Sequence, residues 1–156
     1  MQKKILIIIT GSIASYKALY LIRMLRDKKI FVNVIMTKSA KKFITPLSVS
    51  SLSETKVYDD LFDLTDETEM GHIKLAKMHD LILVMPASSH FIAKISNGLA
   101  DDLASTVLLA SKTKVFIAPA MNINMFNNKI TQKNINYLES LDYSFILGKE
   151  GSLSCG

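Results

Sequence analysis

Val115-Phe-Ile-Ala-Pro-Ala-Met-Asn-Ile-Asn-Met-Phe126 is the stretch that decides the fold of this chain, because an apolar run passes directly into small and amide side chains. Such a run predicts a buried strand that ends at Ala118, just before Pro119. In an open parallel sheet, ligands bind outside the carboxyl ends of the strands. The stretch therefore predicts both a strand and the place of a site.

Three other apolar runs end in the same way. Ile5–Ile9 leads into Thr10-Gly-Ser12, Phe31–Met36 into Thr37-Lys-Ser39, and Leu81–Met85 into Pro86-Ala-Ser-Ser-His90. The carboxyl ends of parallel strands meet at one edge of a sheet, so the four polar clusters are expected to converge there.

The segments between these runs read as helices. Apolar residues recur at helical spacing after Ser12, at Ala14, Ala18, Leu21, Ile22 and Leu25, which predicts an amphipathic helix and a right-handed strand-helix-strand unit. Further helices are expected at 40–43, 46–52, 88–96, 101–110 and 131–141, with Asn97-Gly98 as a break, and strands at Lys114–Ala118 and Tyr143–Leu147. The acidic segment 59–69 is expected to be exposed. The pattern predicts one α/β domain over residues 1–156, with a three-layer, doubly wound parallel sheet.

Composition narrows the function classes. The chain has 156 residues, 49% of them hydrophobic, which suits one domain with a sizeable core. Its formal net charge is +5, but the lysines are scattered, so we expect a solvated surface and no nucleic-acid partner. No segment approaches the ~20 apolar residues of a membrane helix, and Ile5–Ile9 is too short for a secretory signal. The single cysteine, Cys155, allows no internal disulfide, so the expected compartment is the cytoplasm.

Thr10-Gly-Ser-Ile-Ala-Ser15 joins a strand to a helix. Backbone N–H groups at such a junction can bind a phosphate, aided by the helix dipole. The segment lacks the Gly-Lys-Ser/Thr ending of a P-loop. Ser39, Ser105 and Thr106 could add hydroxyl groups at the same edge. The alternative is that each of these residues is an ordinary cap or a solvated side chain.

Two further residues could carry proton chemistry. His72, between Gly71 and Ile73, has a reference pKa of about 6.5, which suits proton or carboxylate handling, although a core or surface histidine remains the alternative. Cys155 lies in a terminal loop and is either an incidental thiol or an acid that folds over the ligand edge. His79 and His90 lack partners at metal-ligand spacing, so no metal site is predicted.

Taken together, the motifs resemble the flavin-dependent cysteine decarboxylases over essentially the whole chain. The resemblance is carried, in chain order, by Gly11-Ser12, Met70-Gly-His-Ile73, Pro86-Ala-Ser-Ser-His90, Pro119-Ala-Met-Asn-Ile-Asn-Met-Phe126 and Gly151-Ser-Leu-Ser-Cys-Gly156. It implies a Rossmann-like or flavodoxin-like flavoprotein that binds FMN. Within the family it points to the branch that converts 4′-phosphopantothenoylcysteine to 4′-phosphopantetheine in coenzyme A biosynthesis.

The resemblance also implies roles for individual residues. His72 would be the catalytic base or carboxylate handler, and Cys155 would donate a proton late in the reaction. Asn122 would bind the cysteine carboxylate or amide of the substrate, with Met125 beside it. The FMN phosphate would lie near Ser12 and Ser39, and the residues implied to hold FMN are Gly11, Ser12, Ile13, Thr37, Lys38, Ser39, Ser88, Ser89, His90, Phe91, Ser105, Thr106 and Ala120.

The implied chemistry explains why these groups occur together. Direct loss of carbon dioxide from a cysteine carboxylate would leave a localised carbanion. Oxidation of the thiol by flavin creates a thioaldehyde beta to the carboxylate, which accepts the electron pair as an enethiolate when carbon dioxide leaves. Return of hydride from the flavin and of a proton from Cys155 completes the reaction.

The chain departs from the family pattern in three places. His90-Phe91 stand where relatives have Asn-Thr, Phe126 stands where they have Trp or Tyr, and the chain stops one residue after Cys155. A fused coenzyme A synthetase domain is absent, so the chain is either a fragment of a bifunctional enzyme or a short stand-alone form. The family implies a homo-trimer or a dodecamer, with His72 contributed by a neighbouring subunit.

Four alternatives remain at this point. A lantibiotic-type peptidyl-cysteine decarboxylase would stop at the enethiol and would not need Cys155. A flavin prenyltransferase shares the fold but does not account for His72 and Pro119–Asn122. A flavin-binding regulatory subunit would need no catalysis, and a non-flavin binding domain would be colourless.

Overall fold

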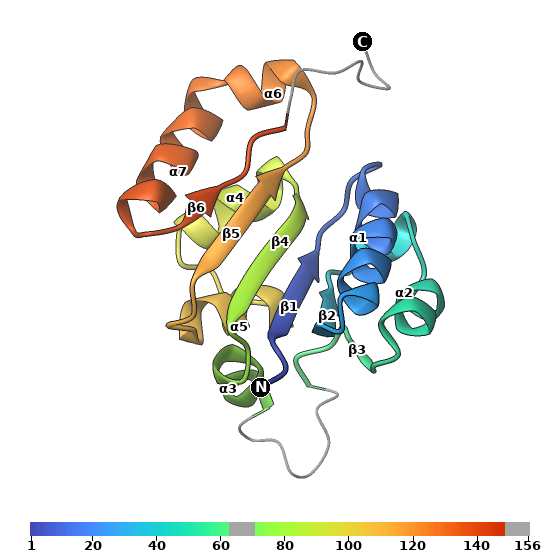
Figure 1. Cartoon of the computed structure of the whole chain (residues 1–156). Coiled ribbons are helices and arrows are strands. Elements are labelled where there is room, and N and C mark those ends of the chain that lie inside the picture. Colours follow the sequence, from blue (N-terminus) through green and yellow to red (C-terminus); the bar gives the residue numbers. More distant parts are fainter. Residues whose placement is uncertain (63–70, 149–156) are drawn as a thin grey trace.

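Six parallel strands form the centre of the structure, a computed structural model that describes residues 1–62 and 71–148 (Figure 1). The strands are β1 (Lys4–Ile9), β2 (Phe31–Met36), β3 (Val57–Tyr58), β4 (Leu81–Ala87), β5 (Val115–Pro119) and β6 (Ser144–Phe145). Their order across the sheet is β3-β2-β1-β4-β5-β6, and every neighbouring pair is parallel. The order changes direction between β1 and β4, and a switch point of this kind is where open α/β sheets bind ligands.

Helices cover both faces of the sheet (Figure 1). They are α1 (Ser15–Asp27), the 3₁₀ turn η1 (Ala40–Lys42), α2 (Pro46–Ser53), α3 (Gly71–Lys77), α4 (Ser89–Ser96), α5 (Leu103–Ala110), α6 (Ile123–Asn127) and α7 (Lys129–Ser140). Among the described helices, none combines the length and the apolar composition needed to cross a bilayer.

Alternate residues of the central strands feed two separate cores. Ile7 and Ile9 of β1 pack with Ala18 and Ile22 of α1. Leu6 and Ile8 of the same strand belong to the opposite core, which the helices α3, α4, α5 and α7 complete. Because side chains alternate across a strand, a strand segment that is buried on both faces is apolar throughout, as Leu6–Ile9 of β1 are. The predicted three-layer, doubly wound parallel sheet is confirmed.

Side-chain caps explain where most of the helices begin. Thr45, with Pro46 next to it, caps α2; Ser88 caps α4; Asp102 caps α5 and Asn128 caps α7. Each side-chain oxygen accepts a hydrogen bond from a backbone N–H that the helix leaves unpaired. By contrast, the longest described helix, α1, has Ala14 at its N-cap position and no side-chain cap.

The structure differs from the sequence-based expectation in short elements. The strand β3 and the helices α3 and α6 were not predicted, and the expected strand Tyr143–Leu147 is only Ser144–Phe145. β3 has two residues and exists through its pairing with β2, Val34 with Val57 and Ile35 with Tyr58. The break at Asn97-Gly98 is confirmed, since Gly98 has a φ of 67°.

His79, between α3 and β4, makes buried polar contacts with α3 and β2. It is 5% exposed, with Nδ1 2.9 Å from the Leu75 carbonyl oxygen and Nε2 2.9 Å from the side-chain amide of Asn33 on β2. Burial lowers the pKa of His79, and the hydrogen bond to Leu75 opposes this only in part. His79 therefore resists protonation in the folded chain.

This lowered pKa predicts a loss of stability in mild acid. Above pH about 6.5 the imidazole is neutral in both states, so its contribution is fully present. As the pH falls from there through the lower pKa of folded His79, the unfolded chain binds more protons and the folded state loses stability. Chemical denaturation at several pH values should show this loss in the wild type and a smaller one in His79→Gln. An equal dependence of the unfolding free energy on pH in the wild type and in His79→Gln would contradict the lowered pKa of His79.

Candidate functional site

Thr10, the residue that follows β1, joins the loops after β1 and β4. It is 1% exposed, and its hydroxyl donates to the Pro86 carbonyl (2.6 Å) and accepts from the Ser88 N–H (2.9 Å). Its backbone N–H also donates to Pro86, at 3.2 Å. These bonds lie at the switch point between β1 and β4, so they set the geometry of the ligand edge.

Gly11 brings the loops after β1 and β2 together. A Cβ atom on Gly11 would lie 2.5 Å from Cβ of Ser39, which is closer than real Cβ atoms approach, and 3.2 Å from the Ser39 backbone carbon. Glycine is therefore required by the contact itself. Two residues that the sequence assigned to one phosphate are thus in contact.

The loop after β5 joins the same edge. The Ala120 N–H donates to the Ala87 carbonyl at 3.0 Å, next to the irregular pairing between β4 and β5. The loops after β2, β1, β4 and β5 are therefore connected in the order of their strands. The predicted convergence of the four polar clusters is confirmed.

The start of α1 presents free donors to this edge. Within the described part of the chain, the backbone N–H groups of Gly11, Ser12 and Ile13 have no hydrogen-bond partner. The Ser12 hydroxyl accepts from the Ala14 N–H (3.1 Å), and the first turn of α1 contains no acidic residue. Unpaired N–H groups and the positive end of a helix dipole suit a phosphate group.

A cavity of about 550 Å³ opens beside these loops. Its walls come from the end of β2, the segment after β3 and the start of α5, and its lining residues include Thr37, Lys38, Asp59, Asp102 and Ala104. Lys41 closes one side through an ion pair with Asp59 at 2.8 Å. The volume is within the range of about 300–1,000 Å³ typical of small-molecule sites.

The predicted site residues on α4 and α5 differ in how much they expose. Ser88 caps α4 by accepting from the Phe91 N–H (3.1 Å), and the Phe91 side chain is in the core at 2% exposure. Ser105 is also buried, with its hydroxyl bonded to Asp102, whereas Thr106 is half-buried and donates to the Asp102 carbonyl (2.6 Å). His90 is exposed and Ser89 half-buried.

Asn122 starts a short helix at the end of β5, where the sequence expected amide side chains. Its Oδ1 accepts from the Asn124 N–H at 2.8 Å, which leaves the side-chain NH₂ group without a partner among the described residues. Met125 is 47% exposed, while Phe126 packs against the core. Asn122 can therefore donate to a carboxylate or carbonyl at this edge.

His72 lies apart from the other predicted residues. It is the half-buried second residue of α3, and Figure 1 shows α3 at the amino ends of β1 and β4. The Ala76 carbonyl, one turn later, accepts from Ser111 (2.9 Å) and Thr113 (3.2 Å), just before β5 begins. Within a single chain, His72 therefore does not reach the edge of the sheet where the carboxyl ends of the strands lie. Met70 and Cys155 lie outside the described residues.

The sequence reasoning missed three residues that shape the site. Thr10 was seen as part of a cluster but not as the link between β1 and β4. Asp102 and Lys94, which join α5 to α4, were not singled out at all. An Asp three residues before Ser105 was a capping signal that could have identified Asp102.

The fold defines a doubly wound α/β protein, and the loops at the switch point of its parallel sheet offer donors that suit a phosphate-bearing ligand. The family model described as Flavoprotein matches residues 1–156, and the chain belongs to this family. It is 43% identical over 154 residues to the coenzyme A biosynthesis bifunctional protein CoaBC of Haemophilus influenzae, covering 99% of this chain and 38% of that protein. The chain thus spans less than two fifths of that relative.

Another relative is matched over most of its own length. The probable phosphopantothenoylcysteine decarboxylase of Streptococcus mutans is 44% identical over 158 residues, covering 100% of this chain and 88% of that protein. Among solved structures, the FMN-dependent cysteine decarboxylase SpaF superposes with a TM-score of 0.90 at 26% identity, covering 96% of this chain and 86% of that one. A PPC decarboxylase complexed with pantothenoylaminoethenethiol superposes with a TM-score of 0.86 at 25% identity. The match covers 100% of this chain and 87% of that one.

Proposed function

We propose that this protein binds FMN and decarboxylates 4′-phosphopantothenoylcysteine to 4′-phosphopantetheine in coenzyme A biosynthesis. The observation that carries the proposal is the cradle formed by Gly11, Ser12 and Ile13 against Ser39, with its unpaired N–H groups. The full-length similarity to the Streptococcus mutans protein supports the choice of substrate. FMN supplies the electron sink that the alkyl thiol of the substrate lacks.

The residues of the chain bind the cofactor, orient the substrate and transfer protons. Ser12 and Ser39 hold the phosphate of the cofactor, and the loops after β4 and β5 position its ring. Asn122 orients the substrate through its free amide NH₂ group, with the exposed Met125 beside it. His72 handles the carboxylate or the thiol proton, and Cys155 donates the last proton.

The visible absorption spectrum of the purified protein tests the cofactor, because a retained flavin is yellow. The protein, incubated with phosphopantothenoylcysteine, should then release carbon dioxide and the saturated thiol phosphopantetheine. A peptide with a carboxyl-terminal cysteine should react far more slowly. Accumulation of an enethiol, or preference for the peptide, would instead favour a lantibiotic-type decarboxylase. A protein that takes up no FMN would overturn the proposal.

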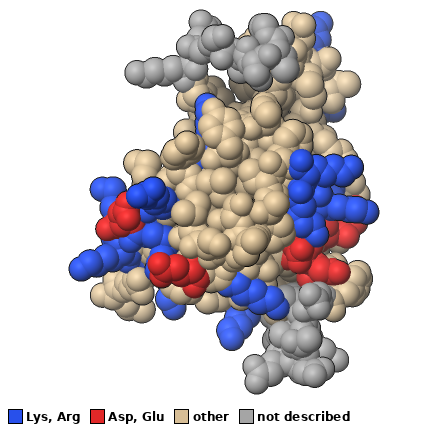
Figure 2. All heavy atoms as spheres, turned by 90° about the vertical axis from the view of Figure 1, so that its right-hand side faces the viewer, with Lys and Arg blue, Asp and Glu red and all other residues tan. Residues whose placement is uncertain are grey.

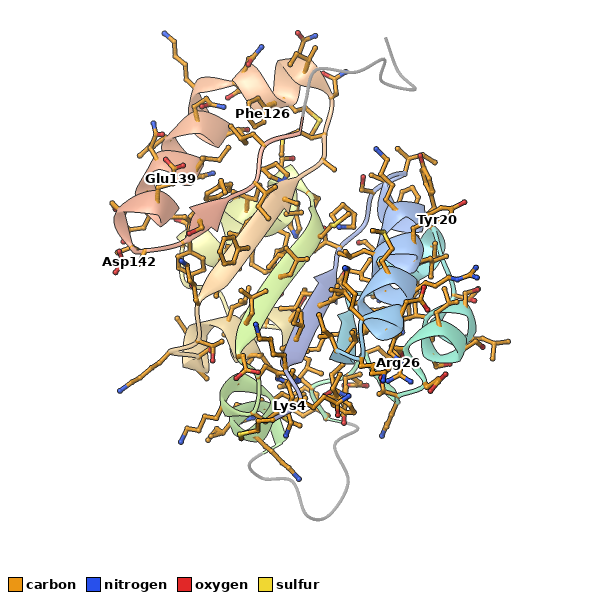
Figure 3. The ribbon with its side chains drawn as sticks, viewed as in Figure 1. Lys4, Tyr20, Arg26, Phe126, Glu139 and Asp142 are labelled. Atoms are coloured by element: carbon orange, nitrogen blue, oxygen red, sulfur yellow. The ribbon has the colours of Figure 1, made fainter. Side chains whose placement is uncertain are left out.

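The active form is proposed to be a homo-oligomer, a trimer or a dodecamer, in which His72 of one chain completes the site of another. The position of α3 at the amino ends of the strands supports this sharing (Figure 1). The apolar side chains Ile13, Tyr16, Tyr20 and Met24 are 49–68% exposed, and Tyr20 projects from α1 away from the sheet (Figure 3).

The face of the molecule that includes α1 offers a surface for such contacts. Figure 2 shows a broad central area of this face without Lys, Arg, Asp or Glu, and charged residues at its rim. Exposed apolar areas rimmed by charge are typical of protein interfaces. Light scattering should give a multiple of the 17.4 kDa chain mass, and the mass of a single chain would contradict the proposal.

A further inference from the structure

Lys94, in the last turn of α4, is an almost enclosed lysine. Its side chain is 11% exposed, and Nζ lies 2.8 Å from Oδ1 of Asp101 and 3.1 Å from Oδ2 of Asp102. Burial alone would lower the pKa of Lys94, but the hydrogen bonds that Lys94 donates to Asp101 and Asp102 outweigh it and the pKa is raised. Lys94 is therefore a fixed positive charge between α4 and the start of α5.

Asp102 uses both of its carboxylate oxygens. Oδ2 accepts from Lys94, while Oδ1 accepts from the backbone N–H (2.8 Å) and the hydroxyl (2.5 Å) of Ser105. The carbonyl oxygen of Asp102 accepts in turn from the backbone N–H (3.0 Å) and the hydroxyl (2.6 Å) of Thr106. The position of Asp102 thus fixes the whole first turn of α5.

This first turn is a wall of the cavity beside the phosphate cradle. The residues Asp101–Ala104 line it together with Thr37 and Lys38, which follow β2. The helix α4, which holds Lys94 at its far end, begins directly after Ser88, at the loop that Thr10 bonds. Lys94 therefore connects two separate parts of the proposed cofactor site.

We propose that Lys94 is a positioning residue of the FMN site, which acts through Asp102 to hold the first turn of α5 in place before the cofactor binds. The inference rests on the proposed function. Asp101 has a minor part, because its side chain is 72% exposed and solvent screens its attraction to Lys94. The two carboxylates on one lysine thus provide a matched pair for a test.

The test is FMN titration of the apoprotein, followed by quenching of flavin fluorescence, in Lys94→Met, Asp102→Asn and Asp101→Asn. Lys94→Met keeps the apolar stem and removes the charge. The Kd for FMN should rise roughly tenfold in Lys94→Met and in Asp102→Asn, as for loss of one hydrogen bond to a charged group, and stay within about twofold of wild type in Asp101→Asn. Lys94→Arg should recover part of the affinity, because it restores the charge.

Hydrogen exchange of the FMN-free variants separates positioning from general stability. Exchange should be faster in residues 102–106 of Lys94→Met and Asp102→Asn, and unchanged there in Asp101→Asn. Faster exchange throughout α4 and α5 with wild-type affinity for FMN would overturn the inference, as would equal effects of the two Asp variants. A wild-type protein without FMN affinity would overturn the proposed function instead.

Discussion

Changing His72 to asparagine is expected to slow decarboxylation by a factor of about 10² to 10⁴ while FMN stays bound, since this is the usual contribution of a positioned acid or base. Asparagine keeps a side chain of similar size and removes the titratable ring. His72 is a half-buried residue of the first turn of α3, distant from the cradle at Gly11 and Ser39, so the FMN site should be undisturbed. Single-turnover release of carbon dioxide, with the flavin spectrum recorded in parallel, measures both quantities.

Lys77→Asn is the matched control, because Lys77 is exposed at the end of the same helix. It should turn over at close to the wild-type rate. Wild-type turnover of His72→Asn would remove the catalytic assignment and leave a flavin-binding protein without this chemistry.

Co-expression of two inactive variants extends this prediction to the subunits. His72→Asn and Asn122→Asp should each be inactive alone. If His72 serves the site of a neighbouring chain, an equal mixture forms some sites with both native residues, and about a quarter of the wild-type activity should return. Sites built within one chain would leave the mixture inactive, because each chain would lack one residue.

Changing Gly11 to alanine is expected to weaken FMN binding by roughly ten- to a hundredfold, because overpacking a close contact costs about 1–3 kcal/mol. The new Cβ would lie 2.5 Å from Cβ of Ser39, so the loops after β1 and β2 must separate. That separation moves the unpaired N–H groups of Gly11, Ser12 and Ile13 away from the phosphate. Calorimetric titration of the apoprotein with FMN measures the loss.

Two further variants make the Gly11 prediction specific. Gly148→Ala adds the same methyl group where no atom of the described residues lies within 4 Å, so it should bind FMN as the wild type does. Gly11→Ala should cost less affinity in a Ser39→Gly background than in the wild type, because Ser39→Gly removes the closest clashing atom, although the Ser39 backbone carbon remains 3.2 Å away. Unchanged affinity in Gly11→Ala would show that the phosphate lies elsewhere.

The sequence predicted the elements whose signal is local. β2 has the predicted bounds, Phe31–Met36, because an apolar run buried on both faces needs no partner to be recognised. The convergence of the polar clusters was also predictable, since it follows from the parallel direction of the strands. By contrast, β3 and α6 have two and five residues, and elements this short form only through their neighbours.

Contacts between distant segments could not be predicted. The approach of Gly11 to Ser39 depends on how the loops after β1 and β2 are positioned relative to each other. The bond from Lys94 to Asp102 depends on how the chain turns between α4 and α5. The separation of His72 from the cradle could not be predicted either, because the position of α3 is set by its packing against α5 and the residues before β5. Each is a matter of tertiary geometry rather than of pattern.

The three unpaired backbone N–H groups just before α1 link the folding equilibrium of this chain to the supply of its ligand. Among the described residues, no group accepts a hydrogen bond from the backbone N–H groups of Gly11, Ser12 and Ile13, so these three donors remain open to an outside anion. Any anion held there adds to the free energy of unfolding, by about 2.7 kcal/mol at a concentration of one hundred times Kd. The chain thus leaves part of its own stability to be supplied from outside, and its lifetime in a cell should follow the abundance of that ligand.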